Sequence, residues 1–183
     1  YITNSVDVAL IAEKYGVDRI WIDLETLGKQ ERQGHIDSVK SKHSINDIKK
    51  ISTKLTKSEM LVRVNPINPC SKEEIIMLPM WKSLDDVKNF LTIVDKRVKT
   101  TLLLETKEAV ECLDEVLENG GFDEIHIGLN DLHLSYHLKF MFELLANGTV
   151  EKICNKIKNY NIPYGFGGVA RLGEGTLPAE KII

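Results

Sequence analysis

Residues 100–131, TTLLLETKEAVECLDEVLENGGFDEIHIGLND, carry the pattern that decides the fold. A short apolar run over residues 100–106 is followed by an amphipathic helical pattern over residues 107–118 and an Asn-Gly-Gly turn. A second apolar run then leads to Asp131. Two strands joined through a helix form a βαβ unit, in which the strands run parallel. The sequence therefore predicts a parallel sheet in this half of the chain.

The same alternation extends through the rest of the 183 residues. Further strand patterns lie at residues 1–4, 19–25, 59–65, 75–80 and 163–169, and further helical patterns at residues 6–15, 45–55, 83–94 and 140–160. Seven strands alternating with helices favour a (β/α)₈ TIM barrel, for which about 250 residues is typical. We therefore expect an α/β fold, a single TIM-barrel domain over residues 1–183 that is incomplete in this chain.

Two parts of the barrel are expected to be missing. Only residues 66–74 separate the strand ending at Asn65 from the strand starting near Ile75, whereas a parallel crossover needs roughly 10–12 residues or more. Residues 71–74 read as the first turn of a helix that is not completed. We expect an interruption of the chain after Glu74, and the eighth strand is expected to lie beyond Ile183.

Composition excludes several classes of function. The chain holds 24 Lys and Arg against 27 Asp and Glu, a net charge of −3, which is not the basic footprint of a nucleic-acid-binding protein. No apolar run approaches the roughly 18–20 residues of a membrane span. The three cysteines are far apart and form no CxxC pair. A cytoplasmic protein with no nucleic-acid or membrane partner is expected.

Charged side chains occur at the carboxyl ends of four predicted strands. Because side chains alternate along a strand, Asp23 and Glu25 share one face of residues 19–25, while Arg63 and Glu105 take the same position on later strands. Asp131 follows the strand pattern within residues 122–131. Carboxyl ends form the catalytic mouth of such barrels. A functional site is predicted there; a salt-bridge network filling the barrel is the alternative.

Excess negative charge at this mouth favours a divalent cation. Buried carboxylates are unfavourable unless they are paired or bind a metal, and oxygen ligands suit Mg²⁺ or Mn²⁺. Glu105 and Asp131, on consecutive strands, are the predicted ligands, which leaves Arg63 to fork a substrate carboxylate. Gly167, Gly168 and Arg171, at the end of the last predicted strand, are candidates for anion binding.

Five segments, in order, resemble the HpcH/HpaI aldolase and citrate lyase family. RIWIDLE is similar to the family's acidic strand, LVRVN to its VRVN segment, IIMLPM to its GVMVPM segment, and LLLETKEAV followed by IHIGLNDLHLSY to its ET and GPxDLS-like segments. The resemblance implies a phosphoenolpyruvate/pyruvate-type barrel with a divalent metal and lyase chemistry on 2-oxo acids or acyl-CoA thioesters. It also implies a homo-oligomer, a trimer or hexamer.

Carried over by position, the resemblance implies a role for each mouth residue. Glu105 and Asp131 match the metal ligands, Arg63 matches the arginine that binds the substrate carboxylate, and Asp23 and Glu25 match the acidic pair beside the metal-bound water. Further matched positions lie in the loop whose backbone N–H groups hold the pyruvate carboxylate: Gly128, Leu129 and Asn130.

The sequence departs from the family where the aldolase branch has a histidine after the acidic strand. Thr26 stands at that position, within a long polar stretch. His35 or Lys29 from this stretch is then a candidate base, with solvated loop residues as the alternative. His126 is either a core histidine or a mouth residue.

We expect a divalent-metal-dependent carbon–carbon lyase acting on a 2-oxo acid or related carboxylate through a metal-stabilised enolate. The predicted catalytic residues are Arg63, Asp23, Glu25 and His35. The alternatives are a non-catalytic or regulatory barrel that binds a small carboxylate, and an acyl-CoA lyase of the citrate-lyase type.

Overall fold

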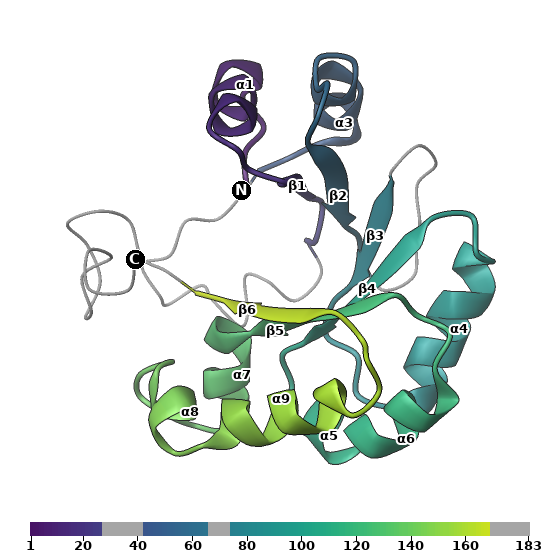
Figure 1. Cartoon of the computed structure of the whole chain (residues 1–183), viewed down its shortest axis with the longest axis vertical. Helices are drawn as coiled ribbons and strands as arrows, with labels where there is room; N and C mark the ends of the chain where they lie inside the picture. The colour runs from purple at the N-terminus through teal and green to yellow at the C-terminus, as the bar shows by residue number, and fades with distance from the viewer. Residues whose placement is uncertain (27–41, 66–73, 169–183) are drawn as a thin grey trace.

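The protein is described from a computed structural model, in which residues 1–26, 42–65 and 74–168 are placed. One parallel sheet runs in sequence order through six strands. The strands are β1 (Arg19–Asp23), β2 (Glu59–Arg63), β3 (Ile75–Leu78), β4 (Lys99–Leu104), β5 (Glu124–Gly128) and β6 (Tyr164–Gly167). The sheet curls into a half-barrel (Figure 1). Of the predicted strand over residues 1–4, only an isolated parallel bridge between Ile2 and Trp21 forms.

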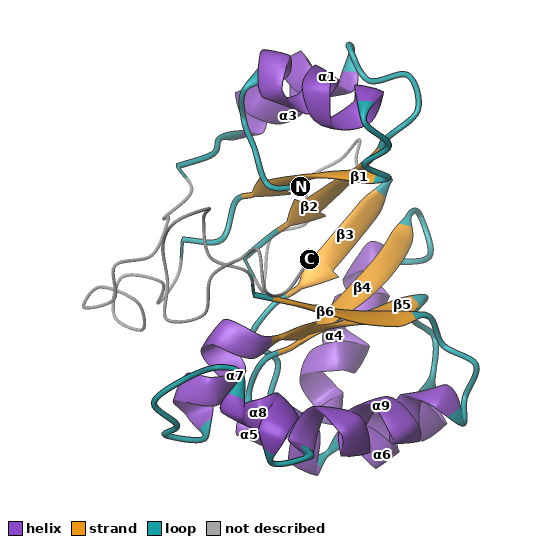
Figure 2. Cartoon of the chain, turned by 60° about the vertical axis from the view of Figure 1, so that its left-hand side comes forward, coloured by secondary structure: helices purple, strands orange, loops and turns teal. Residues whose placement is uncertain are grey.

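Helices cover the outer side of the curl in two groups. Figure 2 shows α1 (Val6–Lys14) and α3 (Ile45–Ser52) beside β1 and β2. The second group lies against the strands from β3 to β6 and comprises α4 (Leu84–Val94), α5 (Lys107–Glu111), α6 (Leu113–Asn119), α7 (Leu129–Ser135), α8 (Glu143–Ala146) and α9 (Thr149–Lys158). The helix predicted over residues 107–118 is therefore two helices that meet at Cys112.

Local sequence explains where α4 begins. The Ser83 hydroxyl accepts the Asp86 N–H at 3.2 Å, and the Asp86 carboxylate accepts the Ser83 N–H at 3.0 Å. This reciprocal capping box satisfies two of the donors that every helix leaves unpaired at its start. The predicted start and end of this helix are confirmed.

Side-chain alternation divides the sheet as predicted. Outward residues such as Ile22, Val62 and Leu104 belong to the large core shared with the helices. A smaller inner cluster contains Leu61, Ile75, Met77 and Leu103, with Trp21 packed against it. The apolar face of each strand therefore drives helix packing, while the inner face is left to position polar side chains.

The connection between β2 and β3 differs in part from the prediction. Glu74 precedes β3 directly: its carboxylate accepts the Met60 N–H at 2.8 Å, and its carbonyl accepts the Lys99 N–H at 3.2 Å. No interruption lies between Glu74 and Ile75, and Glu74 does not begin a helix. The interruption expected after Glu74 is therefore not found, and residues 66–73 lie outside the described part of the chain. The strand expected beyond Ile183 stays a prediction.

No helix in the described parts of the chain is long and apolar enough to cross a membrane.

Candidate functional site

Four carboxylates and one arginine meet at the carboxyl ends of the strands, as predicted. Asp23 ends β1 and Glu25 follows it, Arg63 ends β2, Glu105 follows β4, and Asp131 lies in the first turn of α7. All four carboxylate residues are buried, with 2% to 7% of their surface exposed. Parallel strands place these positions at one edge of the sheet, which explains why residues up to about a hundred positions apart gather there.

Arg63 is held by Asp23. Its Nε donates to Asp23 Oδ1 at 2.9 Å and its Nη2 to Oδ2 at 2.8 Å, while Nη2 lies 3.4 Å from Glu25 Oε2. Burial lowers the pKa of Arg63, but the hydrogen bond and charge of Asp23 outweigh it and the net pKa is raised. This pairing restricts the predicted fork between Arg63 and a substrate carboxylate, and that contact stays a prediction. One full edge of its guanidinium already binds Asp23.

Glu105 is a strongly perturbed carboxyl group of the site. Burial raises its pKa to about 8; the Arg63 charge opposes this, while Asp131 and Glu25 add to it. Its Oε1 accepts one hydrogen bond, from the Met80 N–H at 3.1 Å. A raised pKa of this kind means that the ionised form lacks sufficient positive charge nearby. Glu105 is thus a group that a bound cation would stabilise in its charged form.

Glycine at position 128 allows the backbone to approach this carboxylate. A Cβ at Gly128 would lie 3.1 Å from both Cβ and Oε2 of Glu105. The space beside Glu105 Oε2 therefore exists because residue 128 is glycine and has no side chain.

Glu105 and Asp131 line a common cavity of about 410 Å³, together with Met80, Lys82, Thr106, Glu108, Leu134 and Ser135. Among the residues that the structure describes, no group of three or more His, Cys, Asp or Glu is arranged to hold a metal ion. Two carboxylates still fit Mg²⁺ or Mn²⁺, because Mg²⁺ in enzymes commonly takes one or two carboxylates plus water and substrate. The donor set and the perturbed Glu105 are both compatible with such an ion.

The predicted carboxylate-binding loop has a different structure. Gly128 ends β5 and caps α7, so Leu129 and Asn130 form the first turn of a helix rather than a loop. The Leu129 side chain is fully buried in the core, which leaves only its backbone for binding. The first N–H groups of a helix have no partner within the helix, so an anion can still be bound at this position.

The described structure covers only part of the remaining candidate residues. His35 and Arg171, like Lys29, lie outside the described residues. Gly167 ends β6, and Gly168 follows it with a φ of 143° that favours glycine. Their proposed anion-binding role stays a prediction.

One histidine at this end of the sheet was missed by the sequence analysis. His43 Nδ1 accepts the Asp23 N–H at 2.9 Å, so a neutral His43 carries its proton on Nε2. The sequence around His43 gives little indication of a site residue, because His43 follows a polar stretch and precedes the N-cap Ser44. Only the fold brings it to the end of β1.

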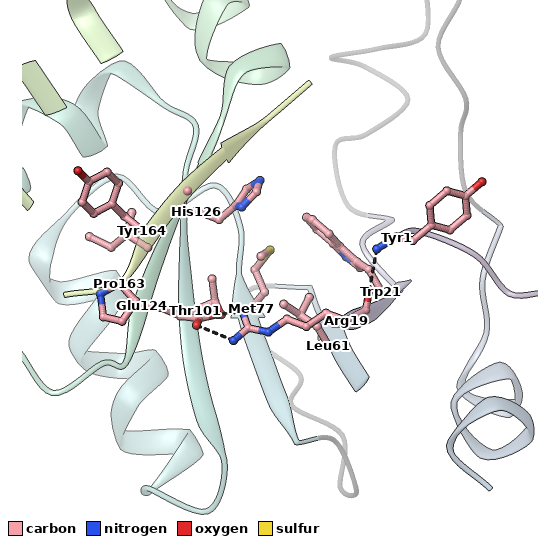
Figure 3. A pocket seen from close by; sticks show the side chains of 12 residues that line it. Tyr1, Arg19, Trp21, Leu61, Met77, Thr101, Glu124, His126, Pro163 and Tyr164 are labelled. Carbon is pink, nitrogen blue, oxygen red and sulfur yellow. Dashed lines mark hydrogen bonds and ion pairs between the residues drawn. The ribbon is translucent and has the colours of Figure 1, made fainter. Parts of the chain in front are cut away.

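A second cavity, of about 420 Å³, opens on the inner face toward the amino ends of the strands (Figure 3). Trp21, Leu61, Met77 and His126 line it. The Arg19 Nη2 donates to Glu124 Oε2 at 2.9 Å at the start of the strands. His126 therefore lies inside the half-barrel rather than at the mouth carboxylates, and burial lowers its pKa.

Comparison with solved structures shows that the fold is that of HpcH/HpaI aldolase and citrate lyase family proteins. An HpcH/HpaI aldolase from Desulfitobacterium hafniense DCB-2 matches with a TM-score of 0.72 and 16% identity over 93% of this chain and 76% of its own. A family protein from Burkholderia cenocepacia J2315 matches with a TM-score of 0.69 and 16% identity over 91% and 77%.

A third neighbour was solved with ligands. The protein CitE from Mycobacterium tuberculosis, in complex with magnesium, acetoacetate and coenzyme A, matches with a TM-score of 0.61 and 13% identity, over 91% of this chain and 62% of its own. No family model matches the sequence, and no curated protein matches it. The fold neighbours are thus proteins of the family whose motifs the sequence resembles.

Proposed function

We propose that this chain is a member of the HpcH/HpaI aldolase and citrate lyase family, with an incomplete (β/α)₈ barrel formed by residues 1–183 as one domain. We propose that it is a metal-dependent carbon–carbon lyase acting on a 2-oxo acid. The observation that carries the proposal is the cavity shared by Glu105 and Asp131, in which burial raises the pKa of Glu105 to about 8. Perturbed carboxyl groups in a cleft at strand ends are typical of active sites.

Glu105 and Asp131 are proposed to hold Mg²⁺ or Mn²⁺. When bound, the ion would supply positive charge to stabilise the negative charge that develops on the substrate's keto oxygen. Support comes from the oxygen-only donor set and from a neighbour that was solved in complex with magnesium. The small-molecule ligands of that neighbour favour a small carboxylate substrate. The homo-oligomer is proposed from the resemblance to the family alone.

The remaining mouth residues are assigned by what they can still bind. Asp23 holds Arg63 in place, so the guanidinium would contact the substrate carboxylate through the edge that does not bind Asp23. The backbone N–H groups of Leu129 and Asn130 would bind the same carboxylate. Glu25 and His35 are the proposed groups that move the proton during carbon–carbon bond cleavage.

Exchange of the C3 protons of pyruvate for deuterium, followed by NMR with Mg²⁺ or Mn²⁺, tests the proposal. Exchange should require the metal and should fall at least about 100-fold in Glu105→Gln and Asp131→Asn, because each removes one anionic ligand. The matched control is Glu115→Gln, which removes an exposed carboxylate on α6. Pyruvate binding without exchange would instead support a non-catalytic barrel.

A further inference from the structure

Trp21 lies directly beneath Arg63 on the inner side of the half-barrel. Trp21 and Asp23 are two residues apart on β1, so both side chains lie on the inner face. In the register with β2, Trp21 pairs with Leu61 and Asp23 pairs with Arg63. The Arg63 Cζ lies 5.5 Å from the centre of the Trp21 ring. One strand thus supplies both a carboxylate for the edge of the guanidinium and an aromatic ring beneath it.

His126 braces Trp21 from across the sheet. The two ring centres are 5.8 Å apart and the ring planes meet at 87°, an edge-to-face contact between β1 and β5. Figure 3 shows these two side chains turned toward one another. Gly167, on the neighbouring β6, leaves room for the imidazole, because a Cβ there would lie 3.0 Å from His126 Nε2. The contact with His126, whose imidazole has room because residue 167 is glycine, therefore restricts the indole.

Tryptophan at position 21 does more than fill apolar space. The Trp21 Nε1–H is buried and, in the described part of the structure, has no hydrogen-bond partner. Such a group is unfavourable, and leucine or phenylalanine would fill apolar space without it. What tryptophan adds is the largest aromatic face, and tryptophan is the best partner for a guanidinium above a ring. Burial lowers the pKa of His126, so a neutral ring braces the indole without placing a second positive charge near Arg63.

We propose that Trp21, braced by His126, is a positioning residue for Arg63. Asp23 fixes the guanidinium within its plane through two hydrogen bonds, and the Trp21 ring limits its movement out of that plane. The two contacts together turn the edge that does not bind Asp23 toward the mouth. The catalytic consequence rests on the proposed lyase function, whereas the positioning itself does not.

Two substitutions at residue 21 separate the aromatic face from bulk. Trp21→Phe keeps a ring beneath Arg63, whereas Trp21→Leu keeps apolar volume without one. The matched control is Trp81→Phe, because Trp81 is the other tryptophan of the chain and also has a buried N–H without a partner in the described structure. Trp81 lies in the β3–α4 connection and belongs to the outer core.

The first readout does not depend on activity. In ¹⁵N NMR spectra, the Arg63 Nε–H signal, assigned by its loss in Arg63→Lys, should exchange slowly with solvent in the wild type and in Trp21→Phe. Trp21→Leu should speed this exchange at least about tenfold, while Trp81→Phe should leave it unchanged. Equal exchange in Trp21→Leu and wild type, measured where both are folded, would overturn the proposal.

The second readout is the pyruvate exchange reaction with Mg²⁺ or Mn²⁺. Trp21→Leu should lower kcat/KM at least about tenfold, and Trp21→Phe should recover most of the loss. If activity falls only as far as the folded fraction of each variant falls, and the folded protein has normal kinetics, Trp21 has a merely structural role. If the wild type shows no exchange reaction, the proposed function fails, and the Arg63 Nε–H measurement alone decides the positioning role.

Discussion

Arg63 and Asp23 form a two-bond ion pair in which Nε donates to Oδ1 at 2.9 Å and Nη2 donates to Oδ2 at 2.8 Å. The side chains expose only 11% and 2% of their surfaces. A buried charge of this kind is stable only while its partner is present. The pair therefore links the stability of the β1–β2 edge to the geometry of the mouth.

Arg63→Lys is expected to reduce both stability and activity. An ammonium group cannot make two parallel hydrogen bonds to one carboxylate, so the free energy of unfolding should fall by about 1–2 kcal/mol. Metal-dependent pyruvate exchange should fall roughly tenfold or more. Urea denaturation and NMR exchange measure the two effects. Lys156→Ala, which breaks an exposed pair with Asp114, should change stability by less than about 0.5 kcal/mol. If Arg63→Lys is as stable as the wild type, the two parallel hydrogen bonds between Arg63 and Asp23 are not required for stability.

Glu105 should make the protein less stable as the pH rises. Its pKa is about 8 in the folded protein against an ordinary value of 4.5, so between these values the folded state binds more protons than the unfolded state. Stability from this group is complete below about pH 4.5 and is lost progressively up to about pH 8. In metal-free protein, Glu105→Gln should flatten this slope and be more stable at pH 8 by about 1 kcal/mol or more. Urea midpoints from pH 5 to pH 8.5 measure it; identical slopes would contradict the assignment.

Divalent metal should raise the melting temperature through the same carboxylates. A ligand that binds only the folded state stabilises it according to its concentration and affinity. Mn²⁺ should therefore increase Tm in the wild type and in Glu115→Gln, but not in Glu105→Gln or Asp131→Asn. Gly128→Ala should also weaken the effect, because the new Cβ would meet Glu105 Oε2 at 3.1 Å. An equal increase in all variants would place the metal elsewhere.

Two glycines of β6 should respond in opposite directions to the same substitution. A Cβ at Gly165 meets nothing within 4 Å, whereas one at Gly167 would lie 3.0 Å from His126 Nε2. Gly165→Ala should therefore stabilise the protein by about 0.5 kcal/mol, because it reduces the freedom of the unfolded chain. Gly167→Ala should destabilise it by about 1 kcal/mol. Urea midpoints compare the two variants, and equal shifts would show that His126 does not occupy this space.

Much of the architecture follows from local sequence. Alternating apolar residues on residues 19–25, 59–65 and 100–106 place their aliphatic faces against helices, and the structure confirms this division. The same alternation puts Asp23, Arg63 and Glu105 on the inner side, at the strand ends. These features depend on the period of the strand and on burial of apolar surface, which are local properties.

Contacts between distant residues needed the fold. Strand periodicity put Arg63 on the inner face, but only the register between β1 and β2 showed that Asp23 binds the Arg63 guanidinium. His43, in the segment before α3, reaches the Asp23 amide from 20 positions along the chain. His126 on β5 meets Trp21 on β1 although the two are 105 positions apart. The perturbed Glu105 likewise results from burial among charges on other strands. Sequence by itself determined which residues face inward, whereas tertiary packing decided which of them pair, since pairing depends on distances that no local pattern specifies.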